Sequence, residues 1–158
     1  MEDTILQTQL ISSSFGHYFE KFATQTRTWT ADLTDDQFWT RPYPYGNSVG
    51  HLVLHVTGNL NYYIGAQIAG TGYVRNRPLE FTDTSRRPKA EVLQALDDTV
   101  AMVTRTVNAQ SVEDWSRAFE ATGMDDRSRF AAVLHCAAHF HHHVGQIIYL
   151  VKELQRQP

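Results

Sequence analysis

Residues 135–148 read HCAAHFHHHVGQII and hold five of the chain's eight histidines within nine positions. Successive residues of an α-helix turn by about 100°, so His139 and His143 lie one turn apart on one stripe, with Gln146 beside them. The apolar arc of this helix includes Phe140, and His143 lies at its edge. Two imidazoles at this spacing can bind one metal ion, and a solvated rim of histidines explains the stretch equally well.

Apolar residues recur at helical spacing in four segments, which predicts four long helices. Their approximate ranges are 3–29, 47–69, 88–108 and 125–154. In the first helix the predicted stripe consists of Ile11, Phe15, Tyr18 and Phe22. Short helical turns are expected after Thr34, which forms a capping box with Gln37, and after Ser111.

The segment 70–87 has no convincing period and is interpreted as a long connection, whose arginines and Glu80 are expected to pair at the surface. A connection of nearly 20 residues can travel the length of a bundle, so the helices on either side of it can run in the same direction. The sequence therefore predicts an all-α fold, a four-helix bundle with up-down-down-up order, in a single domain over residues 1–158.

The composition indicates which partners are not expected and in which cellular compartment the protein is expected. The net charge is −3, from 14 basic and 17 acidic residues, and no basic run exceeds two residues, so a nucleic-acid partner is not expected. No apolar run is long enough to cross a bilayer. The single cysteine, Cys136, predicts a reducing compartment, and we expect a cytoplasmic protein with no membrane partner. Cys136 itself should be buried and should not act as a ligand.

A third histidine, His55, lies on the flank of the predicted helix 47–69, with Asn59 and Tyr62 on the same side. If this helix packs beside helix 125–154, His55, His139 and His143 converge on one point. Three neutral imidazoles with a position left for water are typical of catalytic zinc, and nickel or ferrous iron also accept them. His51 and His135 are the alternative ligands, and a core-edge histidine bonded to a carbonyl is the alternative interpretation of His55.

Several motifs resemble the DinB/YfiT-like superfamily, which consists of four-helix bundles thought to be metalloenzymes. Ser48-x6-His55 and His139-x3-His143-x2-Gln146 carry the resemblance. An uncharacterised subfamily is closer still, on GNS at 46–48, HVTGN at 55–59, RNRxxEF at 75–81 and HVGQI at 143–147. The resemblance implies that His55, His139 and His143 bind one divalent metal ion, and that the protein forms a homodimer. Apolar side chains outside the stripes, including Tyr45 and Trp29, also favour self-association.

Three functional hypotheses follow. In the first, a metal ion activates a low-molecular-weight thiol or a water for attack on a small electrophilic substrate. Thiol transfer is favoured because better-known members of the superfamily are thiol-dependent transferases and isomerases, and metal-assisted hydrolysis is the alternative within this class. The second is a non-catalytic metal-binding or stress-associated protein, and the third is a bundle without metal. Asn59, Tyr62 and Gln146 are expected to orient ligands or contact substrate, and the sequence assigns no catalytic residue.

Overall fold

The computed structural model describes residues 2–156, and the elements in this range are helices. The four long ones are α1 (Glu2–Thr30), α3 (Val49–Leu60), α5 (Lys89–Asn108) and α7 (Arg129–Arg156). A π-helical segment, η1 (Asn61–Ala66), continues α3. The short helices are α2 (Asp35–Trp39), α4 (Leu79–Thr82) and α6 (Val112–Ser116). The predicted all-α fold is confirmed, and α4 is a helical turn inside the segment predicted as a plain connection.

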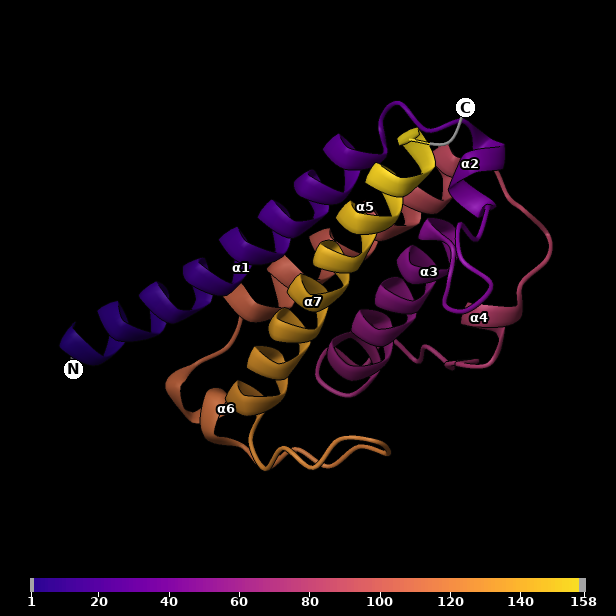
Figure 1. The fold of residues 1–158 in the computed structure, drawn as a ribbon. Helices are drawn as coiled ribbons and strands as arrows, with labels where there is room; N and C mark the ends of the chain where they lie inside the picture. Colours follow the sequence, from indigo (N-terminus) through magenta and orange to yellow (C-terminus); the bar gives the residue numbers. More distant parts are fainter. Residues whose placement is uncertain (1, 157–158) are drawn as a thin grey trace.

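The four long helices form the bundle (Figure 1). Helix α1 packs against α5 and α7, and α3 packs against the same two helices. In Figure 1, α1 and α7 run towards the end of the bundle where α2 lies, whereas α3 and α5 run the opposite way. The chain between η1 and α5 returns along the bundle and carries α4 beside α3. The long connection thus allows α3 and α5 to run in the same direction.

The apolar positions of α5 are buried as their helical spacing predicts, whereas the buried face of α1 differs from its predicted stripe. Leu93, Leu96, Val100, Val103 and Val107 are all buried, as their spacing predicts. In α1 the prediction that Tyr18 belongs to the buried stripe was wrong. Tyr18 is 48% exposed and the adjacent Phe19 is fully buried, because the face that meets α5 and α7 passes through positions 12, 15, 19, 22 and 26.

Helix α7 begins later than its acidic residues suggest. Ser128 Oγ accepts a hydrogen bond from the Ala131 amide at 3.2 Å, so the cap is at Ser128 and not at residue 125 or 126. At the first residue of the helix, the Arg129 amide donates to the Arg117 carbonyl at 3.0 Å, and the chain between these two residues folds back on itself. The backbone groups that an earlier helix start would require are therefore already engaged in hydrogen bonds within this return segment.

No helix within the described range combines the length and the apolar character that a membrane crossing requires.

Candidate metal centre

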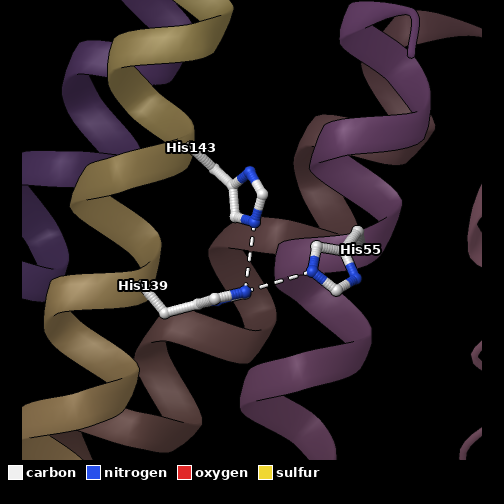
Figure 2. Close-up of side chains that lie close together, drawn as sticks. All are labelled: His55, His139 and His143. Atoms are coloured by element: carbon white, nitrogen blue, oxygen red, sulfur yellow. Dashed lines mark hydrogen bonds between the residues drawn. The ribbon is translucent and has the colours of Figure 1, made fainter. Parts of the chain in front are cut away.

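Three histidine side chains meet between α3 and α7 (Figure 2). His55 projects from α3, and His139 and His143 project from successive turns of α7. The Nε2 atom of His139 lies 3.1 Å from Nε2 of His55 and 3.1 Å from Nε2 of His143. The potential ligand atoms of the group all lie within 4.8 Å of one another. The structure therefore brings together the three histidines that the sequence selected.

Hydrogen bonds on the far side of two rings determine which nitrogen carries the proton. His55 Nδ1 lies 2.8 Å from Glu80 Oε2, and a carboxylate only accepts, so this nitrogen is the donor. Arg75 Nη2 lies further from the same nitrogen, at 3.4 Å, and does not change the assignment. His143 Nδ1 lies 2.7 Å from Gln146 Oε1 and donates to it in the same way. In the neutral form of each ring, Nε2 is then the nitrogen that keeps its lone pair, and it faces His139.

This arrangement suits a cation better than it suits hydrogen bonds alone. A neutral His139 has at most one proton on Nε2 and can donate it to only one of its two neighbours. At least one of the 3.1 Å contacts therefore sets two lone pairs against each other. A metal ion accepts all three lone pairs, and the outer partners of His55 and His143 are those that orient imidazole ligands in metal sites. The donor set fits a single divalent ion with nitrogen ligands.

The surroundings of two rings favour the neutral form that binds metal. Burial, together with the adjacent His143 and His55, lowers the pKa of His139 to about 3. Burial also lowers the pKa of His143 to about 4, although its hydrogen bond with Gln146 acts in the opposite direction. Both imidazoles are therefore neutral at pH 7 and need not lose a proton before they bind an ion.

Glu80 is buried beside the triad, which corrects the expectation of a surface ion pair. Only 6% of the residue is exposed. Arg75 binds its carboxylate with two donors, Nε to Oε1 at 2.7 Å and Nη2 to Oε2 at 2.9 Å. Burial raises the pKa of Glu80, but the hydrogen bonds from His55 and Arg75 outweigh this and hold the pKa below its ordinary value. The carboxylate is therefore ionised and able to accept a hydrogen bond from His55 Nδ1.

Sequence reasoning missed this role because Glu80 lies in a segment without helical period. The signal that was available is the RNRxxEF stretch at 75–81, which places Arg75 and Glu80 together in the motif shared with the resembling subfamily. The next residue also contacts the site, since the Phe81 and His55 ring centroids are 4.7 Å apart. With Arg75, whose Nη2 lies 3.4 Å from His55 Nδ1, three residues of the long connection thus contact one imidazole.

The residues predicted to orient ligands or contact substrate differ in how closely they approach the three histidines. Gln146 contacts His143 directly, as described above. Asn59 is buried, and its Oδ1 has no hydrogen-bond partner among the described residues. Tyr62 packs edge-on against the ring of Tyr63, with centroids 4.9 Å apart, and both line a cavity that also includes Arg75. The hydrogen bonds found for the three histidines do not include Tyr62.

The two alternative ligands are engaged elsewhere. His51 is buried, with Nδ1 2.6 Å from Ser48 Oγ and Nε2 3.0 Å from the Asp83 carbonyl, which anchors the long connection to the start of α3. His135 is exposed and bonds Asp126 at 2.8 Å. Cys136 is fully buried, and burial raises the pKa of its thiol to about 12, so it stays protonated. None of these three residues belongs to the group.

The fold and the three imidazoles define a helical-bundle protein with a candidate mononuclear metal site. The sequence profile described as the DinB superfamily matches residues 18–147, and the chain belongs to that superfamily. No curated protein matches the chain. Among solved structures, a conserved protein from Enterococcus faecalis is similar in fold, with a TM-score of 0.75 and 16% identity. The match covers 91% of this chain and 96% of that one.

Proposed function

We propose that this protein is a divalent-metal-dependent enzyme in which His55, His139 and His143 hold one zinc, nickel or iron ion. The observation that carries the proposal is the convergence of three Nε2 atoms from α3 and α7, with 3.1 Å between neighbours. Three neutral ligands leave the full charge on a bound ion, which supplies the electrostatic stabilisation that lowers the pKa of a thiol or water.

The chain's own residues prepare the site for this chemistry. Glu80 and Gln146 hold the rings of His55 and His143 so that their Nε2 lone pairs point inward. Arg75 neutralises Glu80, so the second coordination layer adds little net negative charge. Phe81 covers one side of the His55 ring and limits its contact with solvent. Glu80 and Gln146 thus keep two of the rings oriented, and burial keeps His139 and His143 unprotonated, before any ion or substrate arrives.

Within the enzyme class we favour transfer of a low-molecular-weight thiol to a small electrophile, and this preference rests on the resemblance stated for the sequence. Metal-assisted hydrolysis uses the same nitrogens with water in place of the thiol. A cytoplasmic setting suits the thiol, because that compartment keeps low-molecular-weight thiols reduced.

The first experiment measures the metal content of protein purified without a histidine tag, by elemental analysis. Wild type should bind about one ion per chain, and His139→Ala should lose this binding, because the middle of the three nitrogens is gone. His17→Ala is the matched control, since His17 is an exposed histidine on α1 that lies outside the group. Equal metal binding by wild type and His139→Ala would overturn the proposal.

A second experiment separates the activities. The metal-loaded protein is assayed for consumption of an alkylating electrophile with and without glutathione, bacillithiol or mycothiol, and in parallel for hydrolysis of ester and amide substrates. Thiol-dependent turnover that His139→Ala lacks is the expected result. Hydrolysis alone would select the hydrolase, and metal binding without turnover of either kind would select a non-catalytic metal-binding protein.

A further inference from the structure

We infer that the connection between η1 and α5 is part of the metal centre, with Glu80 as the positioning residue for His55 and Gly58 as the opening in α3 that admits its carboxylate. The inference rests on the proposed metal-binding function. It assigns roles to Gly58, Arg75 and Glu80, which come from two segments that the bundle brings together.

Gly58 lies three residues after His55, on the same face of α3. A methyl group at this position would overlap Glu80 Oε1 and would lie 2.8 Å from Glu80 Cδ. Glycine is less favourable than alanine inside a helix, yet Gly58 is a buried residue within α3. The missing side chain is therefore what allows the carboxylate to approach the helix and reach the His55 ring.

Hydrogen bonds from Arg75 and His55 hold the carboxylate at this opening. Arg75 and Glu80 are both nearly buried, with 9% and 7% of their side chains exposed, and they form two hydrogen bonds. Glu80 Oε2 also accepts the His55 Nδ1 proton at 2.8 Å. Loss of this acceptor would let His55 rotate or move its proton to Nε2, the atom that the triad requires as a lone pair.

The effect on metal binding has a predictable size. Removing an outer partner of a metal-binding histidine weakens metal affinity by roughly 10-fold to 100-fold. We expect a loss of this size for Zn²⁺ in Glu80→Ala. Glu80→Gln should restore part of it, because the amide oxygen can still accept the Nδ1 proton although the charge is gone.

The decisive variant is Gly58→Ala. Alanine should strengthen α3 as a helix, yet it should displace the Glu80 carboxylate and weaken Zn²⁺ binding by about 10-fold or more. Gly145→Ala is the matched control, because Gly145 is a helical glycine of α7 and a methyl group there meets no atom within 4 Å. This control should keep the wild-type affinity.

A double variant shows whether Gly58 acts through Glu80. In Glu80→Ala the displaced side chain is absent, so adding Gly58→Ala should cost no further Zn²⁺ affinity. Dissociation constants are measured by competition with a chromophoric chelator, at a temperature where each metal-free variant is folded by circular dichroism. If Gly58→Ala does not fold, the Glu80→Ala and Glu80→Gln pair decides alone.

Two different failures can be told apart. Wild-type Zn²⁺ affinity in folded Glu80→Ala, or variants with lower melting temperatures and unchanged dissociation constants, would overturn this inference and leave the triad intact. Absence of Zn²⁺ binding by wild type, or equal binding by wild type and His139→Ala, would overturn the proposed function itself.

Discussion

His139 and His143 remain neutral at a pH where an exposed histidine takes up a proton, because burial and adjacent imidazoles lower their pKa values to about 3 and about 4. In the unfolded chain both return to the ordinary value of about 6.5. Between about pH 4 and pH 6.5 the unfolded chain therefore binds more protons than the folded chain, and acidification favours unfolding.

The first prediction is that the melting temperature of the metal-free protein falls as the pH drops from 6.5 to 4. Carboxylates with lowered pKa values, such as Glu80, add to the loss at the acidic end of this range. The comparison with His139→Gln isolates the histidine contribution, since this variant should lose less stability over the same interval. Parallel curves for the two proteins, measured by thermal denaturation in a chelating buffer, would contradict the prediction.

Arg75 also acts at the scale of a single residue, as the cation that neutralises a buried carboxylate. Arg75→Met should destabilise the protein by about 3 kcal/mol, because it leaves Glu80 buried without its charged partner. The control is Arg156→Met, which removes a pair whose arginine side chain is 79% exposed and should cost less than about 1 kcal/mol. Urea denaturation of the two variants measures both values, and equal costs would count against the buried pair.

The sequence predicts the candidate site in part. Contacts between residues close in the sequence could be predicted, and those between distant segments could be predicted less well. His139 and His143 are one helical turn apart, so their proximity follows from spacing alone. Convergence of His55 with them requires α3 beside α7, which the bundle hypothesis supplied. Glu80 has no periodic segment around it, and its place beside His55 depends on the return path of the connection. No local pattern encodes that path.

At the scale of elements, helix α7 carries a buried apolar stripe and, beside it, the two histidines of the candidate metal centre. Cys136 belongs to the buried stripe, fully enclosed by the core. We predict that Cys136→Ala keeps the Zn²⁺ affinity of wild type and loses roughly 1 kcal/mol of stability through the small cavity that it creates. A chelator-competition titration and a urea melt test the two parts, and loss of tight binding in a folded variant would make the thiol a ligand after all.

The long helices could be predicted because their apolar periods extend over many turns, and their ends could not be predicted as well. Helix α7 illustrates the difference. Asp126, which reads as a helix-start residue, instead bonds His135 at 2.8 Å, and Ser128 provides the cap. A helix begins at whichever of several nearby polar residues caps its first backbone amides. The sequence alone does not show which of these residues will do so.

At the scale of the whole molecule, one face of the bundle remains apolar and exposed. The face consists of residues from α1 and α7 and includes Leu6, Leu10, Tyr18, Phe130 and Leu134, each at least 38% exposed. The groove along it contains no Asp, Glu, Lys or Arg among its lining residues. Of the side chains that suggested self-association from the sequence, Trp29 packs against the core and Tyr45 is exposed. Self-association is therefore expected at this α1–α7 face.

The last prediction is that two copies of the chain associate through the α1–α7 face. A two-fold dimer buries the same patch on both subunits, so an uncharged apolar face is compatible with itself. Light scattering at tens of micromolar should give the mass of a dimer for wild type and of a monomer for Leu134→Glu, which would place a charge in the buried patch.

Val112→Glu is the control, because Val112 is 49% exposed on α6, outside this face, and the variant should stay dimeric. Leu134→Glu should keep Zn²⁺ affinity, since Leu134 is not one of the triad's bonding partners. A monomeric wild type, or a dimer that survives Leu134→Glu, would show that this face does not join two copies.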